Sequence, residues 1–283
     1  MGDNSADSAA IYLDLLKRTL TASIYDESSW IYQEPRRPAL AGVKQPLRFA
    51  EDLARYVVIR GLRRRSVIAA KVRPYQESVR QEGRDWPCFG YTMTGHRRLE
   101  NVQMCVQDVL DNDVPGDFLE AGAWRGGTTI FMRAMLKVLG VEDRKVWVAD
   151  SFEGLPVPRD ESDGADFSKI GILAVSLQQV RDNFRKFGLL DDQVEFLPGW
   201  FCDTLADAPI GSLAILRLDG DMYSSTMDTL TSLFDKVSPG GYVIVDDYHS
   251  WKSCRQAVHD FLDARSLTPE ITTIDWAGAY WKV

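Results

Sequence analysis

Cysteine is scarce in this sequence and is scattered along it. The 283 residues contain no C-x-x-C pair, and the four cysteines are Cys88, Cys105, Cys202 and Cys254. Thiols at such spacings indicate neither a zinc site nor a disulfide framework, and they fit a reducing cytosol. The polar, acidic start of the chain lacks the apolar core of a signal peptide, and no apolar run is long enough to cross a bilayer. We therefore predict a cytoplasmic protein that has no membrane partner.

An excess of basic residues is also lacking. Lys and Arg number 33 against 41 Asp and Glu, which gives a net charge of −8. A chain of this charge has no overall field that attracts nucleic acid, and the local basic cluster at 63–65 is typical of a solvated helix face. Hydrophobic residues make up 45% of the chain, enough for one large domain with an appended N-terminal segment. The expected partner is a small molecule and not a nucleic acid.

Residues 1–90 predict a helical N-terminal extension or cap. Residues 1 to about 7 are expected to be disordered, and from Ser8 apolar residues recur at helical spacing. A proline-rich breaker follows at 34–38, then a second helix through 53–59 and a turn at 86–90. An irregular, aromatic segment of this kind is typical of a cover over a site or of a subunit contact. We expect a homodimer or a higher homo-oligomer.

From residue 91 to residue 283 strands and helices alternate. Apolar runs predict strands at 118–120, 146–150, 194–197, 213–218, 242–245, 271–274 and 279–283. Helices are expected at 99–110, 128–139, 176–188, from 224 onward and at 253–264, and a turn at 238–241. Because the last two strands follow one another without a helix between them, the pattern predicts an α/β domain with a mostly parallel, mixed sheet that ends in an antiparallel hairpin strand.

Two of these apolar runs end abruptly in pairs of acids. Leu216 to Leu218 leads into Asp219 and Asp221, and Val243 to Val245 leads into Asp246 and Asp247. Acids at the exits of buried strands lie at the rim of the sheet, where open α/β folds bind their ligands. Carboxylates that converge there repel one another, so we expect a divalent cation such as Mg²⁺, with Asp219, Asp246 and Asp247 as its oxygen ligands.

The turn after the first strand of this series carries glycines in the pattern G-x-x-x-G-G. It begins with Glu120 and Gly122 and enters a helix at Thr128. Glycines let a ligand approach the backbone, but a dinucleotide favours G-x-G-x-x-G, and Glu120 would repel phosphates. S-adenosylmethionine carries a sulfonium and an ammonium group and no phosphate, so it suits this turn. We assign Glu120, Gly122 and Thr128, together with Met93 and Asp219, to the donor site.

The next two strands supply the remaining donor contacts. Asp150 ends its strand where it could accept both hydroxyls of a ribose, and Ser151 and Phe152 would flank the nucleoside. Gly199 and Trp200 follow the third strand and offer surface to an adenine, although Trp200 is equally consistent with core or lid packing. The long polar segment at about 153–175 is typical of a lid that orders over bound ligands.

The ordered set of motifs closely resembles the macrocin O-methyltransferase-like family. The motifs are E-x-G-x-x-x-G-G, A-D-S-F-E-G-L-P, F-L-P-G-W-F, L-R-L-D-G-D-x-Y and G-G-Y-V-I-V-D-D-Y, from about Tyr91 to Val283. The helix from Ser8 also looks like the family's, whereas residues 30–83 are partly unmatched. Enzymes of that family methylate deoxysugar hydroxyls on macrolide and aminocoumarin antibiotics. The resemblance implies a class I methyltransferase fold, Rossmann-like, with S-adenosylmethionine as donor, a magnesium-type metal and a glycosylated natural product as substrate.

The residues and the resemblance predict the same chemistry. A sugar hydroxyl is a poor nucleophile, and a divalent cation that binds it lowers its pKa while a nearby carboxylate takes its proton. We assign Asp221 as the general base, with Asp219 in that role as the competing assignment and His249 as a third candidate. The main alternative function is a metal-dependent methyltransferase of catechol-type phenols. An NAD-dependent oxidoreductase and a non-catalytic nucleoside-binding module fit the glycine turn and the clustered acids less well.

Overall fold

The main sheet has the strand order that brings the predicted acids together. A computed structural model describes residues 3–32, 46–63 and 70–283, and within these the sheet runs β6-β5-β4-β7-β8-β10-β9. Its strands are β4 (Asp117–Ala121), β5 (Val146–Asp150), β6 (Val194–Pro198), β7 (Leu213–Leu218), β8 (Val237–Val245), β9 (Thr272–Thr273) and β10 (Ala279–Lys282). The first five are parallel, and β10 pairs antiparallel with both β8 and β9. The predicted mixed sheet with a C-terminal antiparallel hairpin is confirmed.

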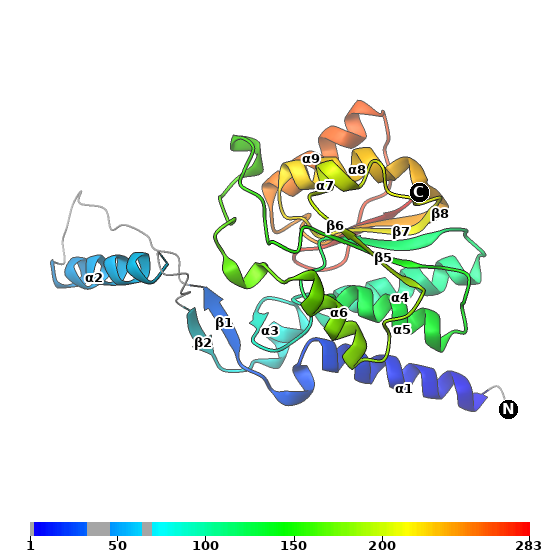
Figure 1. Ribbon diagram of the computed structural model, residues 1–283, viewed down its shortest axis with the longest axis horizontal. Coiled ribbons are helices and arrows are strands. Elements are labelled where there is room, and N and C mark those ends of the chain that lie inside the picture. Colours follow the sequence, from blue (N-terminus) through cyan, green and yellow to red (C-terminus); the bar gives the residue numbers. More distant parts are fainter. Residues whose placement is uncertain (1–2, 33–45, 64–69) are drawn as a thin grey trace.

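Helices cover both faces of this sheet (Figure 1). On one face lie α1 (Asp3–Leu20), α4 (His96–Asp111), α5 (Gly127–Val138) and α6 (Leu177–Lys186), and on the other α7 (Phe201–Thr204), α8 (Tyr223–Leu233) and α9 (Lys252–Ala264). Short 3-10 turns lie at η1 (Ser23–Tyr25), η2 (Glu161–Asp163), η3 (Gly171–Leu173) and η4 (Phe234–Lys236). The strand order reverses at β4, so the carboxyl ends of β4 and β7 flank the crevice where α/β folds bind ligands.

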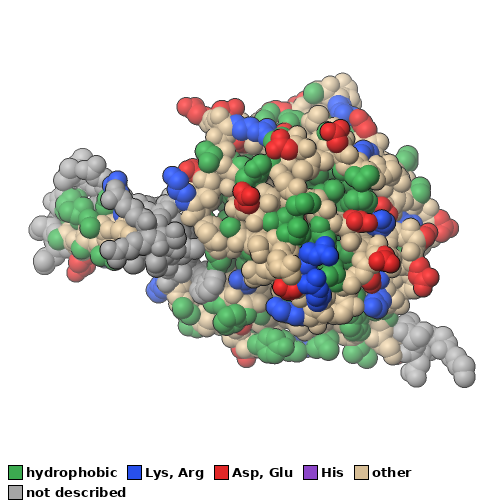
Figure 2. Space-filling model, viewed as in Figure 1, with side chains coloured by type: hydrophobic (Ala, Val, Ile, Leu, Met, Phe, Trp, Pro, Cys, Tyr) green, Lys and Arg blue, Asp and Glu red, His purple; other side chains and the backbone are tan. Residues whose placement is uncertain are grey.

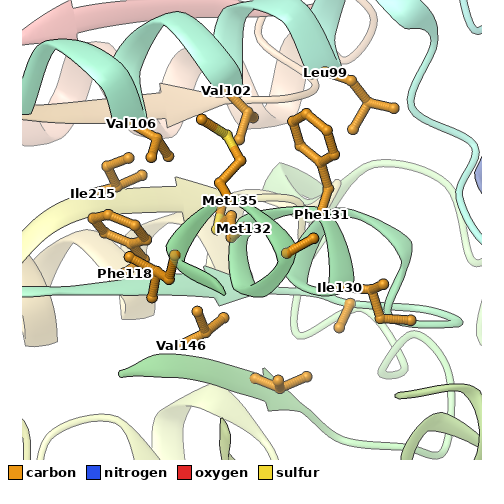
Figure 3. Close-up of a cluster of buried hydrophobic side chains, with 14 of the residues drawn as sticks. Leu99, Val102, Val106, Phe118, Ile130, Phe131, Met132, Met135, Val146 and Ile215 are labelled. Atoms are coloured by element: carbon orange, nitrogen blue, oxygen red, sulfur yellow. The ribbon is translucent and has the colours of Figure 1, made fainter. Parts of the chain in front are cut away.

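The larger core lies between the sheet and α4 and α5. Leu99 and Val102 of α4 face Phe131 and Met135 of α5, and Phe118 of β4 packs beneath them (Figure 3). The helical spacing of these apolar residues on α4 and α5 is the reason that both helices form against the sheet. Leu13, Leu16 and Leu20 of α1 belong to the same buried cluster. The first helix of the N-terminal segment is therefore packed onto the domain that contains the main sheet.

The prediction for the N-terminal segment was incomplete, because it missed a small sheet. Strand β1 (Ser29–Tyr32) pairs antiparallel with β2 (Ala70–Arg73) on one side and β3 (Trp86–Pro87) on the other. The predicted turn at 86–90 thus begins within a strand. The two helices α2 (Pro46–Arg63) and α3 (Glu77–Gln81) complete this segment. The breaker at 34–38 lies outside the described residues, and the domain boundary near residue 90 stays a prediction.

Two further local predictions were wrong. Helix α1 already begins at Asp3, so the expectation of disorder through residue 7 fails for residues 3–7. The predicted turn at 238–241 lies inside β8, where the register with β7 shifts between Leu213 and Ile215. The backbone N–H of Gly240 donates to Val283 O at 2.6 Å, and Val283 N–H donates to Gly241 O at 2.9 Å. A proline is tolerated in a strand at such an irregularity. Among the described residues, no helix is long and apolar enough to cross a membrane.

Candidate active site

A cavity of about 1100 Å³ opens at the carboxyl ends of β4, β5, β7 and β8. This volume is slightly above the usual range of about 300–1,000 Å³ for small-molecule sites, so it can hold a cofactor and a second ligand together. Most of the predicted site residues line it, namely Met93, Glu120, Gly122, Thr128, Asp150, Ser151, Trp200, Asp219, Asp221, Asp246 and Asp247. Residues from six separate stretches of the chain are thus brought to one place by the strand order.

The glycine turn after β4 passes very close to the end of β7. Gly122 has φ +96°, and a Cβ at this position would lie 1.8 Å from the carbonyl oxygen of Asp219. Only glycine fits, because any side chain would collide with backbone. The turn is closed by Gly126, also at positive φ, which is the N-cap residue of α5. The turn therefore holds Glu120 and Asp219 side by side at the rim of the sheet.

The Glu120 carboxylate is buried, and only one of its two oxygens accepts a hydrogen bond from the described residues. Its Oε1 accepts a hydrogen bond from Arg217, but its Oε2 has no hydrogen-bond partner among the described residues, although the residue is only 1% exposed. Burial raises the pKa of Glu120 to about 8, against the opposing effect of the Arg217 charge. A buried carboxylate oxygen without a partner is costly, so its presence beside the cavity marks a position suited to a cationic group of a ligand.

Asp150 has a structural role in addition to the one predicted. Its Oδ2 accepts hydrogen bonds from the backbone N–H groups of Ala123 and Trp124 at 2.8 and 3.2 Å, and its Oδ1 accepts from Phe152 N–H at 2.7 Å. The carboxylate therefore fastens the glycine turn to the end of β5. Oδ2 already accepts two hydrogen bonds and Oδ1 accepts one, so Oδ1 keeps a lone pair for a ligand, and contact with a ribose stays a prediction.

Three acids form a compact cluster at the ends of β7 and β8. One carboxylate oxygen from each of Asp219, Asp246 and Asp247 lies within 4.8 Å of the others. Oδ2 of Asp247 is buried and has no hydrogen-bond partner among the described residues, whereas Oδ1 accepts from Ser250 Oγ at 3.0 Å. Burial, and then the charge of Asp246, raise the pKa of Asp219 to about 6, and the pKa of Asp247 is raised well above its usual range.

Two buried arginines, which the sequence prediction missed, neutralise part of this cluster. The Arg217 side chain, on β7, is fully buried and contacts Glu120, Asp219 and Asp246, with an Nη1 to Oδ2 distance of 2.8 Å for Asp219. Arg98, on α4, binds the other oxygen of Asp246 and lies 3.2 Å from Asp275. Burial opposes the charged form of Arg217, but the three carboxylates outweigh it and raise its pKa. The positive charge expected between the acids is thus supplied in part by the protein.

Asp221 lies beside this cluster and outside the arginine contacts. It has φ +59°, a left-handed conformation that costs a non-glycine residue energy and is often found at functional sites. Burial, and then the charges of Asp219 and Asp246, raise its pKa to about 7. The side chain lines the cavity within reach of Asp247. Hydrogen bonds with Asp247 and Trp251 oppose part of this rise in pKa, and neither arginine contacts the carboxylate.

The comparisons with known proteins agree with this geometry. A family model described as Macrocin-O-methyltransferase (TylF) matches residues 9–283. The chain belongs to the macrocin O-methyltransferase family. It is 53% identical to the demethyldecarbamoylnovobiocin O-methyltransferase of Streptomyces niveus over 74% of this chain and 81% of that protein. It is also 53% identical, over 71% of this chain and 78% of the relative, to 8-demethyl-8-(2,3-dimethoxy-alpha-L-rhamnosyl)-tetracenomycin-C 4′-O-methyltransferase of Streptomyces olivaceus.

A solved structure supports the same assignment. The O-methyltransferase NovP is 44% identical, superposes with a TM-score of 0.79, and the match covers 97% of this chain and 98% of that one. A member of the macrocin O-methyltransferase family with this fold is an S-adenosylmethionine-dependent O-methyltransferase of class I. The resemblance and the fold class predicted from the sequence are confirmed, and the NAD-dependent and non-catalytic alternatives are excluded.

Two predicted donor residues do not line the cavity of this family member. Phe152 is 8% exposed and packs against Phe196, with ring centroids 6.5 Å apart, so it belongs to the core. Gly199 donates its N–H to Asp150 O at 3.0 Å, so it joins the end of β6 to the end of β5. Trp200 does line the cavity. Aromatic residues that sequence reasoning did not assign to the site also line the cavity, namely Trp86, Trp124, Phe167, Trp251 and Trp276.

His249 and His259 have side-chain partners within the fold. His249 Nε2 lies 3.0 Å from Thr273 Oγ1, and His259 Nε2 lies 2.8 Å from Tyr248 Oη. None of the three histidines is among the residues that line the cavity in the described part of the chain. The geometry thus favours a carboxylate over His249 as the proton acceptor.

Proposed function

We propose that this enzyme transfers the methyl group of S-adenosylmethionine to a deoxysugar hydroxyl of a glycosylated antibiotic, of macrolide or aminocoumarin type, with the help of a divalent cation such as Mg²⁺. The observation that carries the proposal is a pair of buried carboxylate oxygens in one cavity, Glu120 Oε2 and Asp247 Oδ2, that have no hydrogen-bond partner in the described part of the chain. Each one suits a cation, and they lie on the two sides of Asp219. The names of two relatives, which specify novobiocin and rhamnosyl-tetracenomycin derivatives, support the class of acceptor.

The donor would be held at the β4 and β5 ends of the cavity. Bound S-adenosylmethionine supplies a methyl group that is already activated by the positive sulfur. Glu120 Oε2 is placed to bind a positively charged group of the donor, and Gly122 lets it approach the backbone. Asp150, Ser151 and Trp200 line the same side and are proposed to surround the nucleoside. The role of these residues is to fix the direction in which the methyl group points.

A divalent cation would be held by Asp219, Asp246 and Asp247. Oxygen ligands of this kind suit Mg²⁺, and the unpartnered Asp247 Oδ2 is the most available of them. Both oxygens of Asp246 already accept hydrogen bonds from arginines, so that carboxylate is held rigidly and has fewer lone pairs to offer. When bound, the cation would position the acceptor hydroxyl and lower its pKa.

Asp221 is the proposed general base. It lines the cavity next to the three clustered acids, yet it is not engaged by Arg98 or Arg217, so its carboxylate can turn toward a substrate. It would take the hydroxyl proton as the oxygen attacks the methyl group. Asp219 is the competing base. Its contact with Arg217 at 2.8 Å favours a fixed, charged role over proton transfer.

Calorimetry tests the cofactor and metal parts of this proposal separately. S-adenosylmethionine and then Mg²⁺ are titrated into the wild type and into an Asp246→Ala, Asp247→Ala variant. We expect the wild type to bind both and the variant to keep the donor but lose the metal. A wild type that binds the donor but no divalent ion would leave the acids without a metal role. Failure to bind the donor would remove the basis of the proposal.

Turnover assays decide between acceptors. The proposal predicts methylation of glycosylated antibiotic precursors that carry a free deoxysugar hydroxyl, and no methylation of the bare aglycone. The alternative function is methylation of a catechol-type phenol, which needs the same donor and metal. A catechol that is methylated faster than any glycosylated acceptor would favour that alternative.

The oligomeric state is part of the proposal. Ile11, Leu15 and Tyr25 are 69%, 45% and 71% exposed, and Figure 2 shows hydrophobic side chains along the lower edge of the molecule, where Figure 1 places α1 and η1. On α2, Val57 and Val58 are both 59% exposed. Exposed apolar side chains grouped in this way favour association with a second copy. Light scattering in solution should give a dimer or larger, and a monomer would refute this part.

A further inference from the structure

Helix α8 begins directly after the proposed catalytic acids, and its first turn lacks a cap from its own segment. The residue before it is Met222, whose side chain makes no capping hydrogen bond. The first N–H groups of a helix need acceptors from elsewhere. The N–H of Ser224 donates at 2.6 Å to Oδ1 of Asp163, a residue 61 positions earlier in the predicted lid. The lid thus supplies the cap for the helix that follows Asp219 and Asp221.

Asp163 is buried, and both of its carboxylate oxygens accept hydrogen bonds. It ends η2, is only 3% exposed, and its other oxygen, Oδ2, accepts from Arg159 N–H at 2.7 Å. One carboxylate therefore joins the lid backbone to the start of α8. A negative charge at a helix N-terminus is also favoured by the helix dipole. Each oxygen accepts a hydrogen bond and the residue is buried, so the carboxylate is held in this position.

The start of α8 fixes the conformation of Asp221. The N–H of Met222 donates to Gly220 O at 2.6 Å, and Thr226 N–H donates to Met222 O at 3.0 Å, so the turn and the helix form one unit. Within that unit Asp221 holds its left-handed backbone, which persists only where the surroundings enforce it. If the first turn of α8 moves, the direction of the Asp221 carboxylate changes with it.

The lid also contacts the second pair of acids. The Phe167 ring packs edge-on against Trp251, with centroids 5.1 Å apart, and Trp251 N–H donates to Asp247 O at 3.0 Å. Arg159 of the lid also forms two hydrogen bonds, at 3.1 and 2.6 Å, with Asp228, which lies one helical turn after Ser224 on α8. The Arg159 side chain is half exposed, so this surface pair contributes little compared with buried Asp163.

We propose that Asp163 is a positioning residue for catalysis: by capping α8 it makes docking of the lid and correct placement of Asp221 a single event. This inference rests on the proposed role of Asp221 as the base. It follows that the proton acceptor is in place only when the lid covers the cavity. Water is then excluded at the moment when the carboxylate is ready to take a proton.

Hydrogen exchange tests the coupling without any acceptor substrate. In an Asp163→Ala variant the peptide Asp219–Thr226 should exchange about tenfold faster than in the wild type, because loss of a cap shifts the local equilibrium by about that factor. Trypsin should also cut faster after Lys169, which is exposed in the lid. The matched control is Glu161→Ala, since Glu161 is an exposed acid in the same short turn and its side chain makes no hydrogen bond among the described residues. The control should behave as the wild type.

Kinetic measurements then show whether Asp163 positions Asp221 or only helps the lid to cover the cavity. Asp163→Ala should lower kcat about tenfold or more while the KM for the donor changes less than about twofold, and Asp163→Asn, which keeps one acceptor oxygen, should recover part of kcat. Unchanged exchange at 219–226 would overturn the proposal, and so would faster exchange with a wild-type kcat. If no glycosylated acceptor is turned over by the wild type, the proposed function fails, and the exchange measurement still decides whether Asp163 couples the lid to α8.

Discussion

Replacing Arg217 by methionine should destabilise the enzyme more than most single substitutions do. Arg217 is 0% exposed and is the shared partner of Glu120, Asp219 and Asp246. Methionine fills a similar volume but leaves Glu120 and Asp219 without this cation, whereas Asp246 keeps Arg98. Removal of one partner of a buried ion pair costs about 3–5 kcal/mol, because the other charge stays buried without compensation. Because the buried acids can take up protons once the arginine is gone, the loss in free energy of unfolding stays within that range.

The assay is thermal unfolding of the protein without ligands. A domain of this size loses about 2–4 °C of Tm for each kcal/mol, so Arg217→Met should melt roughly 6–20 °C below the wild type. The Arg217→Lys variant keeps the positive charge, but its ammonium group cannot bind three carboxylates at once as the guanidinium does. Its Tm should therefore lie between those of the wild type and Arg217→Met. These two variants separate the contribution of the charge from that of the geometry.

A double variant provides the internal check. Glu120→Gln removes the charge that faces Arg217 Nη1, so the Glu120→Gln, Arg217→Met combination should be more stable than the sum of the single effects predicts. An Arg217→Met protein that melts within about 2 °C of the wild type would refute the reasoning, since that is less than 1 kcal/mol. Strict additivity in the double variant would show that Glu120 and Arg217 are not coupled.

Three further outcomes follow from the site and the fold. Asp221→Asn should lower kcat about 100-fold or more in acceptor turnover assays while calorimetry shows unchanged donor affinity; an unchanged kcat would exclude Asp221 as the base. Asp247→Asn should weaken Mg²⁺ binding in calorimetry and leave donor affinity unchanged, and equal loss of both would show that one site serves both ligands. Hydrogen bonds from Arg133 lower the pKa of Asp191 in the folded protein. The ionised Asp191 therefore stabilises the fold at pH values above its pKa in the unfolded chain, and this contribution is lost as the pH falls through its pKa in the folded protein. Urea unfolding of Asp191→Asn should therefore show a loss of up to about 1 kcal/mol at pH 7, since Asp191 is partly exposed, and a loss that shrinks below about pH 4.

The β/α part of the fold could be predicted because its elements carry local signals. β5 was predicted with its observed bounds, Val146–Asp150, since it is an apolar run between turns. Helix α6 has Ser176 as its capping residue and Gly188 just beyond its end, both typical of helix boundaries. The site followed from the same elements, because acids at the ends of neighbouring parallel strands must lie close together.

The N-terminal sheet could not be predicted by the same means. β1 and β2 have four residues each, and their pairing joins Trp30 to Val72 across a stretch that contains α2. Strands so short carry no clear alternation, and their stability comes from partners far along the chain. The error at 238–241 has a similar cause: Pro239 and Gly240 are typical of turns, and only the strand partners β7 and β10 keep this segment in the sheet.

Arg217 is the residue that the sequence contained and the prediction overlooked. It stands in the middle of L-R-L-D-G-D, a run interpreted as apolar, and its register partner on β4 is Glu120. A charged residue inside a strand that is buried on both faces is stable only when opposite charges reach it. The two facts together, an arginine in a buried strand and acids at the same rim, predict an ion cluster that the protein partly neutralises itself. With Arg98 added, two guanidinium groups face Glu120, Asp219, Asp246 and Asp275. Asp221 and Asp247, which neither arginine contacts, are then the carboxylates most available for the proposed proton transfer and cation binding.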